Sequence, residues 1–258
     1  MKSLFLATAA VAALTAAPAL AQDGVGSIGV TYSNTDVDVL GLSGEAEQAT
    51  LDAGFAVPLT ADWTVTLDGA FAQVIDGPDG VDNSAVNGRI HASRNFGNVR
   101  VGAFAGGAEA LDEQLWSVGA EAQAYLNDKV TLTGSLAYET IDGADAEIWS
   151  LGGDASYFVS PNFRLNAGAG WSTADLGSGV DGDGWSANVG GEYQFAGTGT
   201  SVTAGYVRSE IEDLDLQADT FNIGLRFSFG GGDLQTRQRS GADLGRTVAG
   251  IGSLAGAF

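Results

Sequence analysis

The stretch TFNIGLRFSF, residues 220–229, alternates apolar and polar side chains without a break. Its apolar members are Phe221, Ile223, Leu225, Phe227 and Phe229, and its small or polar members are Thr220, Asn222, Gly224, Arg226 and Ser228. Successive side chains of a strand point to opposite faces, so this strand has one apolar and one polar face. It fits a membrane barrel with a watery lumen, or a half-buried strand of a soluble sheet.

The same alternation recurs along the rest of the chain. It predicts twelve strands of about ten residues, the length that a tilted strand needs to cross a bilayer. The expected strands are 25–34, 47–57, 63–74, 85–95, 99–107, 115–126, 130–140, 148–158, 163–172, 185–195, 200–210 and 219–229. Glycine weakens the alternation in places, as in 99–107, so ten or fourteen strands stay open as alternatives.

The expected links between strands alternate between short and long. The short links are 58–62, 96–98, 127–129, 160–162 and 196–199. The longer links are mostly acidic, and the clearest are 36–45, 76–83 and 175–184. Short turns at one rim and long loops at the other, with an even number of strands, are typical of bacterial outer-membrane barrels.

The tryptophans favour the membrane interpretation over a soluble periplasmic β-protein. They are predicted at the ends of strands, where aromatic belts meet the lipid headgroups, and are Trp63, Trp116, Trp149, Trp171 and Trp185. A soluble sandwich would more often bury its tryptophans in the middle of strands.

Residues 1–21 have the features of a cleaved secretory signal peptide, with Lys2 before an apolar run that ends in Ala19-Leu20-Ala21. The alternative is an N-terminal membrane anchor. The expected organisation is a signal peptide over 1–21, an all-β single antiparallel transmembrane barrel over 22–229, and a C-terminal extension, periplasmic or lumenal, over 230–258.

The charge and the absence of cysteine exclude several classes of function. The formal net charge is −21, and removal of the leader with Lys2 makes it −22, so nucleic acid is a poor partner. Without cysteine the chain has neither disulfides nor thiolate metal sites. We expect no cofactor and no enzymatic activity.

In this pattern the chain resembles the porin-like family of Gram-negative outer-membrane β-barrel proteins. In its number of strands it resembles the small twelve-stranded channels and the autotransporter translocation domains. The resemblance covers roughly residues 23–229. It implies contact with outer-membrane lipid and insertion by the barrel assembly machinery, which usually reads an aromatic residue at the end of the last strand. Phe229 fits that role, and Phe258 at the end of the chain is the alternative.

The polar strand faces predict the lining of the lumen. Expected lumen residues are Asp52, Asp68, Arg89, His91, Arg100, Glu121, Asp154, Arg164, Glu192 and Arg226. This mixture of charges, with acidic loops at the mouth, predicts a porin-like channel for passive diffusion of ions or small hydrophilic solutes that favours cations. The alternative is a closed structural or surface-interaction barrel without conductance.

Two patterns offer weaker hypotheses of chemistry. His91 and Ser93 have the i, i+2 spacing of the histidine and serine in outer-membrane phospholipases, but they are expected on the lumen face, away from lipid. The acidic stretches 79–82 and 181–183 offer oxygen ligands that calcium prefers, without the full calcium-loop pattern.

The tail after residue 229 begins with Gly230-Gly231-Gly232 and carries Arg237, Arg239 and Arg246. Its composition is compatible with a disordered periplasmic tail. The contrast with the acidic barrel supports a second hypothesis, in which the arginines enter the lumen and partly plug it.

Overall fold

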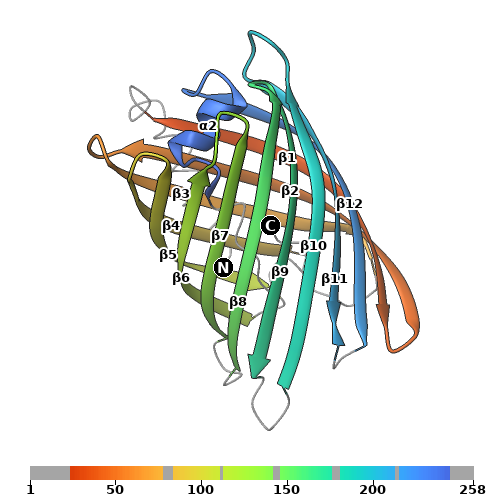
Figure 1. Ribbon diagram of the computed structural model, residues 1–258. Helices are drawn as coiled ribbons and strands as arrows, with labels where there is room; N and C mark the ends of the chain where they lie inside the picture. The colour runs from red at the N-terminus through yellow and green to blue at the C-terminus, as the bar shows by residue number, and fades with distance from the viewer. Residues whose placement is uncertain are drawn as a thin grey trace.

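A computed structural model describes residues 24–77, 84–110, 113–141, 146–175, 181–212 and 215–244. Within them the chain forms twelve strands in a closed antiparallel barrel and one α-helix, α2 (Figure 1). The strands are β1 (Val25–Val39), β2 (Leu42–Pro58), β3 (Trp63–Asp76), β4 (Ser84–Asn95), β5 (Val99–Ala110), β6 (Glu113–Tyr125), β7 (Val130–Ile141), β8 (Ala146–Ser160), β9 (Phe163–Asp175), β10 (Asp181–Gln194), β11 (Thr200–Ile211) and β12 (Leu216–Phe229).

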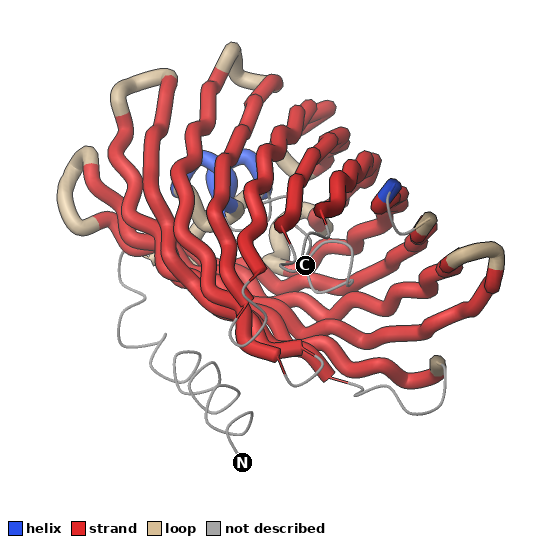
Figure 2. Tube along the Cα trace, turned by 90° about the horizontal axis from the view of Figure 1, so that it is seen from below, coloured by secondary structure: helices blue, strands red, loops and turns tan. Residues whose placement is uncertain are grey.

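Each strand pairs with the next along the chain, and β1 pairs with β12 to close the ring. The closing register runs from Gly26 opposite Phe229 to Val39 opposite Leu216. Figure 2 shows the strands as one continuous wall. Closure leaves no strand edge with unpaired backbone groups, which is the condition for crossing lipid with strands. The prediction of twelve strands is confirmed, and the alternatives of ten and fourteen are wrong.

The two faces of the wall have opposite character. Large apolar side chains point outward and are exposed, as Ile223 at 62 % and Leu225 at 61 % show. Polar side chains point into the lumen and are buried, as are Ser27, Thr66 and Ser201. This is the inverse of a water-soluble protein, and so wide an apolar band needs an apolar surrounding. The polar members of 220–229 therefore line the lumen.

The opposite character of the two faces predicts unequal costs for one charge introduced on either face of β12. We expect Leu225→Arg to destabilise the folded barrel by about 2–4 kcal/mol, because the charge would lie in the middle of the lipid-facing band. The lumen-facing Asn222→Arg serves as the matched control and should cost much less. Urea unfolding in lipid vesicles measures both, and equal costs would contradict the assignment of the faces.

The prediction of a long loop over residues 36–45 is wrong. The structure instead extends β1 and β2 with Asp36 opposite Glu45 and closes the hairpin with a two-residue turn. Leu40 and Gly41 form this turn with φ values of 52° and 80°, and such positive φ values at both central residues match the twist of a tight hairpin. Strands that continue past the apolar band into water can carry charges on both faces, so charge did not mark the end of the strand.

The loop predicted over 175–184 is also shorter than expected, because β10 begins at Asp181, which lies opposite Asp175 of β9. Residues 181–183 are therefore part of a strand and form no acidic turn. The stretch 79–82 lies outside the described residues, as do residues 1–23.

The chain turns back into the barrel directly after β12. Gly230 and Gly232 have φ values of 77° and 76°, which residues with a side chain rarely adopt. The helix α2 (Leu234–Ser240) follows; its N-cap Asp233 accepts a hydrogen bond from the Thr236 amide at 2.7 Å, and Gly241 ends it with a φ of 92°. Figure 1 shows α2 at the same end of the barrel as the short turns. No helix among the described residues is long and apolar enough to span a membrane.

Candidate functional site: the barrel lumen

The ten residues predicted to line the lumen all lie on the inner face of the wall. Seven are buried: Arg89, His91, Arg100, Glu121, Arg164, Glu192 and Arg226. Asp154 is half-buried and accepts a hydrogen bond from the Ser156 hydroxyl at 3.1 Å. Asp52 and Asp68 line a cavity. The structure gathers most of the ten into three charged clusters.

The first cluster centres on His91, which links three strands. Its Nε2 lies 2.5 Å from Asp68 Oδ2 on β3, and its Nδ1 lies 3.0 Å from both carboxylate oxygens of Glu121 on β6. An imidazole donates to both carboxylates only when each ring nitrogen carries a hydrogen. Ser93 instead accepts a hydrogen bond from Arg100 Nη1 at 3.1 Å. Because both nitrogens of His91 face carboxylates, this geometry does not form a histidine–serine pair.

The second cluster is an ion pair across β12, β1 and β2. Arg226 donates from Nη1 and Nη2 to the two oxygens of Asp52, at 2.7 and 2.8 Å, and also from Nη1 to the Ser27 hydroxyl at 3.2 Å. A bidentate pair of this kind fixes both side chains against the wall. It also leaves the two charges compensated within the lumen lining.

The third cluster joins the C-terminal segment to the wall. Arg237 of α2 is fully buried and donates to Glu192 of β10 at 2.9 and 2.6 Å. It donates from Nε to Asp243 at 2.9 Å, and Arg164 of β9 bridges Asp243 and Glu192 at 2.8 and 2.9 Å. Two guanidinium groups and two carboxylates thus compensate one another. Burial alone lowers the pKa of Arg237, but the carboxylates of Asp243 and Glu192 outweigh burial and raise that pKa.

Further contacts hold the same segment on several sides of the lumen. The Gln238 side-chain amide donates to Ser156 Oγ of β8 at 2.9 Å, Thr66 of β3 donates to the Gly241 carbonyl at 3.1 Å, and Arg100 of β5 donates to the Arg239 carbonyl at 2.8 Å. Leu234, Ala242 and Leu244 are buried. Residues 233–244, called the plug below, therefore occupy part of the lumen at the short-turn end.

The three arginines of the tail take different places. Arg237 enters the lumen, whereas Arg239 stays at the rim, with Nη2 3.4 Å from Asp128 Oδ1 and its guanidinium over the Tyr125 ring. Arg246 lies outside the described residues. Asp243 was not among the predicted lumen residues, although it completes the cluster. The sequence marked Asp243 only by its acidic side chain, six positions after Arg237.

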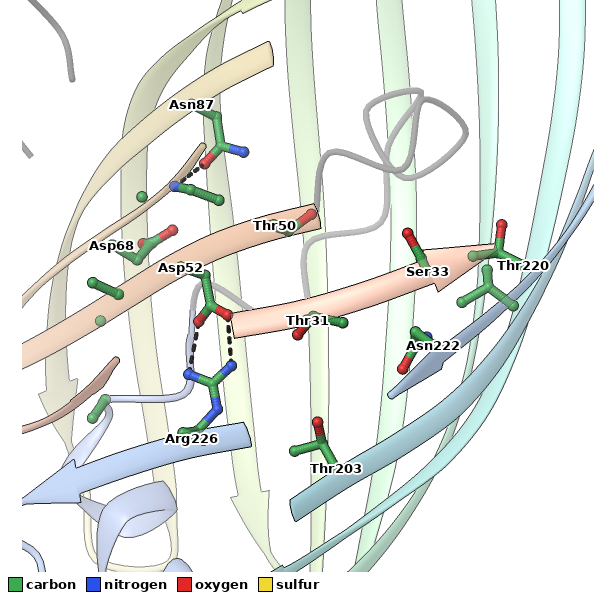
Figure 3. A pocket seen from close by; sticks show the side chains of 16 residues that line it. Thr31, Ser33, Thr50, Asp52, Asp68, Asn87, Thr203, Thr220, Asn222 and Arg226 are labelled. Carbon is green, nitrogen blue, oxygen red and sulfur yellow. Dashed lines mark hydrogen bonds and ion pairs between the residues drawn. The ribbon is translucent and has the colours of Figure 1, made fainter. Parts of the chain in front are cut away.

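A cavity of about 280 Å³ lies in the lumen beside the plug, and Ala242 of the plug is part of its lining. Figure 3 shows polar side chains of β1, β2, β11 and β12 around it, with the pair between Asp52 and Arg226 at one side. Glycine lets the plug come close to the wall beside this cavity. At Gly54 a Cβ would lie 3.0 Å from the Ala242 carbonyl oxygen, so the plug approaches the bare backbone of β2.

The predicted interface aromatics lie on the outer face. Trp63, Trp116, Trp149 and Trp171 are exposed, and Trp185 is half-buried opposite Trp171 in the strand register. Trp63 lies near the short-turn end, with the Arg94 guanidinium 5.9 Å from its ring centre. Phe229 ends β12, and its ring lies 5.9 Å from that of Phe55. Phe258 lies outside the described residues. No group of three or more histidines and acidic residues in the described ranges could hold a metal ion.

Comparison with solved structures identifies this architecture. An outer membrane channel from Pseudomonas putida F1 matches with a TM-score of 0.60 at 12 % identity, over 80 % of this chain and 95 % of that one. The NanC porin matches with a TM-score of 0.57 at 7 % identity, over 77 % and 98 % of the two chains. The chain has the fold of Gram-negative outer-membrane β-barrels.

This outer-membrane barrel fold is also that of the translocator domain of the autotransporter NalP from Neisseria meningitidis, with a TM-score of 0.54 at 14 % identity over 86 % and 98 % of the chains. No family model and no curated protein sequence matches the chain. At such low identity the solved structures establish the outer-membrane barrel fold, and the lumen geometry has to support any function.

Proposed function

We propose that the protein is a porin-like channel of the outer membrane for passive diffusion of ions or small hydrophilic solutes. The observation that carries the proposal is a polar lumen enclosed by a wall that is apolar outside. A water-filled bore lowers the cost of moving a hydrated solute past lipid, and the channel performs no bond chemistry. The similarity to solved outer-membrane channels supports this function at the level of fold.

The proposal includes an orientation and a route to the membrane. In outer-membrane barrels the short turns face the periplasm, so the plug would lie at the periplasmic end. The leader, residues 1–21, would direct export and then be cleaved. We propose that the barrel assembly machinery reads the aromatic end of β12, Phe229, and that outer-membrane lipid contacts the apolar band.

We further propose that the channel favours cations over anions. Acidic side chains gather at the long-loop end, where Asp36, Asp38 and Glu45 are exposed and Glu212 lies in the link after β11. Such a mouth attracts cations and repels anions at low salt. The lumen charges themselves are largely paired, as in the cluster of Arg226 and Asp52, so the mouth would set most of the preference.

The plug favours a second function, a closed barrel that conducts nothing and whose loops contact external partners. Its buried contacts with β3, β8, β10 and β12 occupy one end of the lumen. With the plug in the lumen, ions would have to pass beside it, or the plug would have to be displaced first.

Single-channel recording on purified, refolded protein tests both functions. Discrete conductance steps are expected of a channel. Absence of such steps from every form of the protein, including one without the plug, would contradict the channel and support the closed barrel. In a salt gradient we expect a reversal potential that indicates cation preference. The preference should fall when Asp36, Asp38 and Glu45 are changed to Asn, Asn and Gln.

The matched control for selectivity is Asp62→Asn, at the short-turn rim, where Arg94 lies 3.7 Å from the Asp62 carboxylate and offsets its charge. We expect this variant to keep the wild-type reversal potential. Equal effects of the two sets of substitutions, or no effect of either, would contradict the role of the mouth.

A further inference from the structure

The cavity beside the plug has the size of a small organic molecule. Its volume is about 280 Å³. Sites for drug-sized ligands have volumes of about 300–1,000 Å³, so this cavity suits something smaller, of roughly monosaccharide size. Because Ala242 of the plug forms part of its lining, a solute that enters from the long-loop end would reach this cavity beside the plug.

The lining is rich in neutral hydrogen-bonding groups. Five hydroxyl side chains and two asparagines contribute, mostly from β1, β2, β11 and β12. Figure 3 shows Thr31, Thr203 and Asn222 close together on one side of the cavity. Between Thr31 and Thr203 lies Gly224, where a Cβ would be 2.8 and 2.7 Å from the two hydroxyl oxygens. The glycine thus leaves both hydroxyls room to face the lumen.

The charged groups of the lining are engaged within the wall. Arg226 forms its bidentate pair with Asp52, and Asp68 contacts His91. An anion or a cation that entered the cavity would lose hydration and would have to compete with these existing pairs for an opposite charge, which costs free energy. A neutral solute with many hydroxyls would exchange its hydrogen bonds to water for hydrogen bonds to the wall at little cost.

We propose that this cavity is a binding site for a small, neutral solute rich in hydroxyl groups, of the chemical class of the monosaccharides. The proposal rests on the proposed channel function, because it names the class of solute that the lumen selects. The hydroxyls of Thr31 and Thr203 and the amide of Asn222 contact the solute, and Ala242 of the plug borders the site.

Three probes of similar ring size separate the possible ligands: glucose is neutral, glucuronate is an anion and glucosamine is a cation. Saturation-transfer NMR on the full chain, in a detergent without a sugar headgroup, gives a dissociation constant for each. We expect saturable binding of glucose that is at least about tenfold tighter than that of either charged probe. Tighter binding of glucosamine would instead indicate a cation site at Asp52 and Asp68, and absence of saturable glucose binding would overturn the proposal.

Two substitutions localise the binding. Thr203→Val keeps the shape of the side chain and removes its hydroxyl, and Asn222→Leu removes the amide. A neutral hydrogen bond is worth about 0.5–1.5 kcal/mol, so each variant should bind glucose between about twofold and tenfold more weakly. The control is Thr131→Val on β7, a buried lumen residue that does not line the cavity. Equal weakening by the control, or no weakening by the two variants, would contradict the site.

Binding is measured here without any ionic current, so the two proposals can fail separately. If the protein binds glucose and never conducts, the binding site is supported and the channel function is contradicted. If the protein conducts and does not bind glucose, the channel function is supported and the binding site is contradicted.

Discussion

Truncation after Gly231, which removes the whole plug, is expected to raise the single-channel conductance severalfold over that of the full chain. The plug occupies part of the lumen at the short-turn end and is held there by contacts with β3, β5, β8 and β10. The barrel closes through β1 and β12 without any part of the plug, so the truncated chain keeps its wall. Planar-bilayer recording of the refolded proteins measures the difference.

The matched control is truncation after Leu244, which removes residues 245–258 and keeps the plug. Its conductance separates the contribution of the plug from that of residues 245–258. Equal conductance of all three proteins would contradict a barrier role of the plug. Delivery of both truncated proteins to the outer membrane in cells would also support Phe229 as the residue that the assembly machinery reads, since both proteins lack Phe258.

Arg237→Met is expected to release the plug from the wall while the barrel stays folded. The substitution removes the guanidinium that pairs with Glu192 and Asp243 in a fully buried site. Removal of one partner from a buried ion pair costs about 3–5 kcal/mol, because the remaining charges are left without compensation. Hydrogen exchange of the amides of residues 233–244 should become faster, and the conductance should approach that of the protein truncated after Gly231.

Arg239→Met is the control for this prediction. Arg239 lies at the rim, and its ion pair with Asp128 is exposed, with 97 % of the Asp128 side chain accessible. Such a pair contributes at most about 1 kcal/mol, so the plug should keep its protection from exchange. Slow exchange in Arg237→Met, or equally fast exchange in both variants, would show that the buried cluster does not hold the plug.

The faces of the wall could be predicted from the sequence, because a strand alternates its side chains with a period of two. Leu225 points outward and Arg226 inward for this local reason alone. The lengths of the strands could not be predicted as well. Asp36 and Glu45 belong to paired strands that extend beyond the apolar band, where water solvates charges on either face and hydropathy no longer marks the end.

The tail and the lumen show the limit of local patterns most clearly. The sequence indicated that arginines of an extension could enter an acidic barrel, but it favoured a disordered periplasmic tail. Glu192 lies 45 positions before Arg237, and only the closed wall and the reversal at Gly230 bring the two side chains together. The cavity likewise depends on Thr31 and Thr203, which lie on strands that meet β12 from opposite sides.

By itself, then, the sequence determined a barrel that is apolar outside and polar inside, because that property repeats every second residue. Only the tertiary structure decided that a C-terminal segment occupies one end of the lumen, that most of the predicted lumen charges lie in paired clusters and that a polar cavity remains beside the segment. Those features depend on distances between residues far apart in the chain, and closure of the ring between β1 and β12 sets these distances.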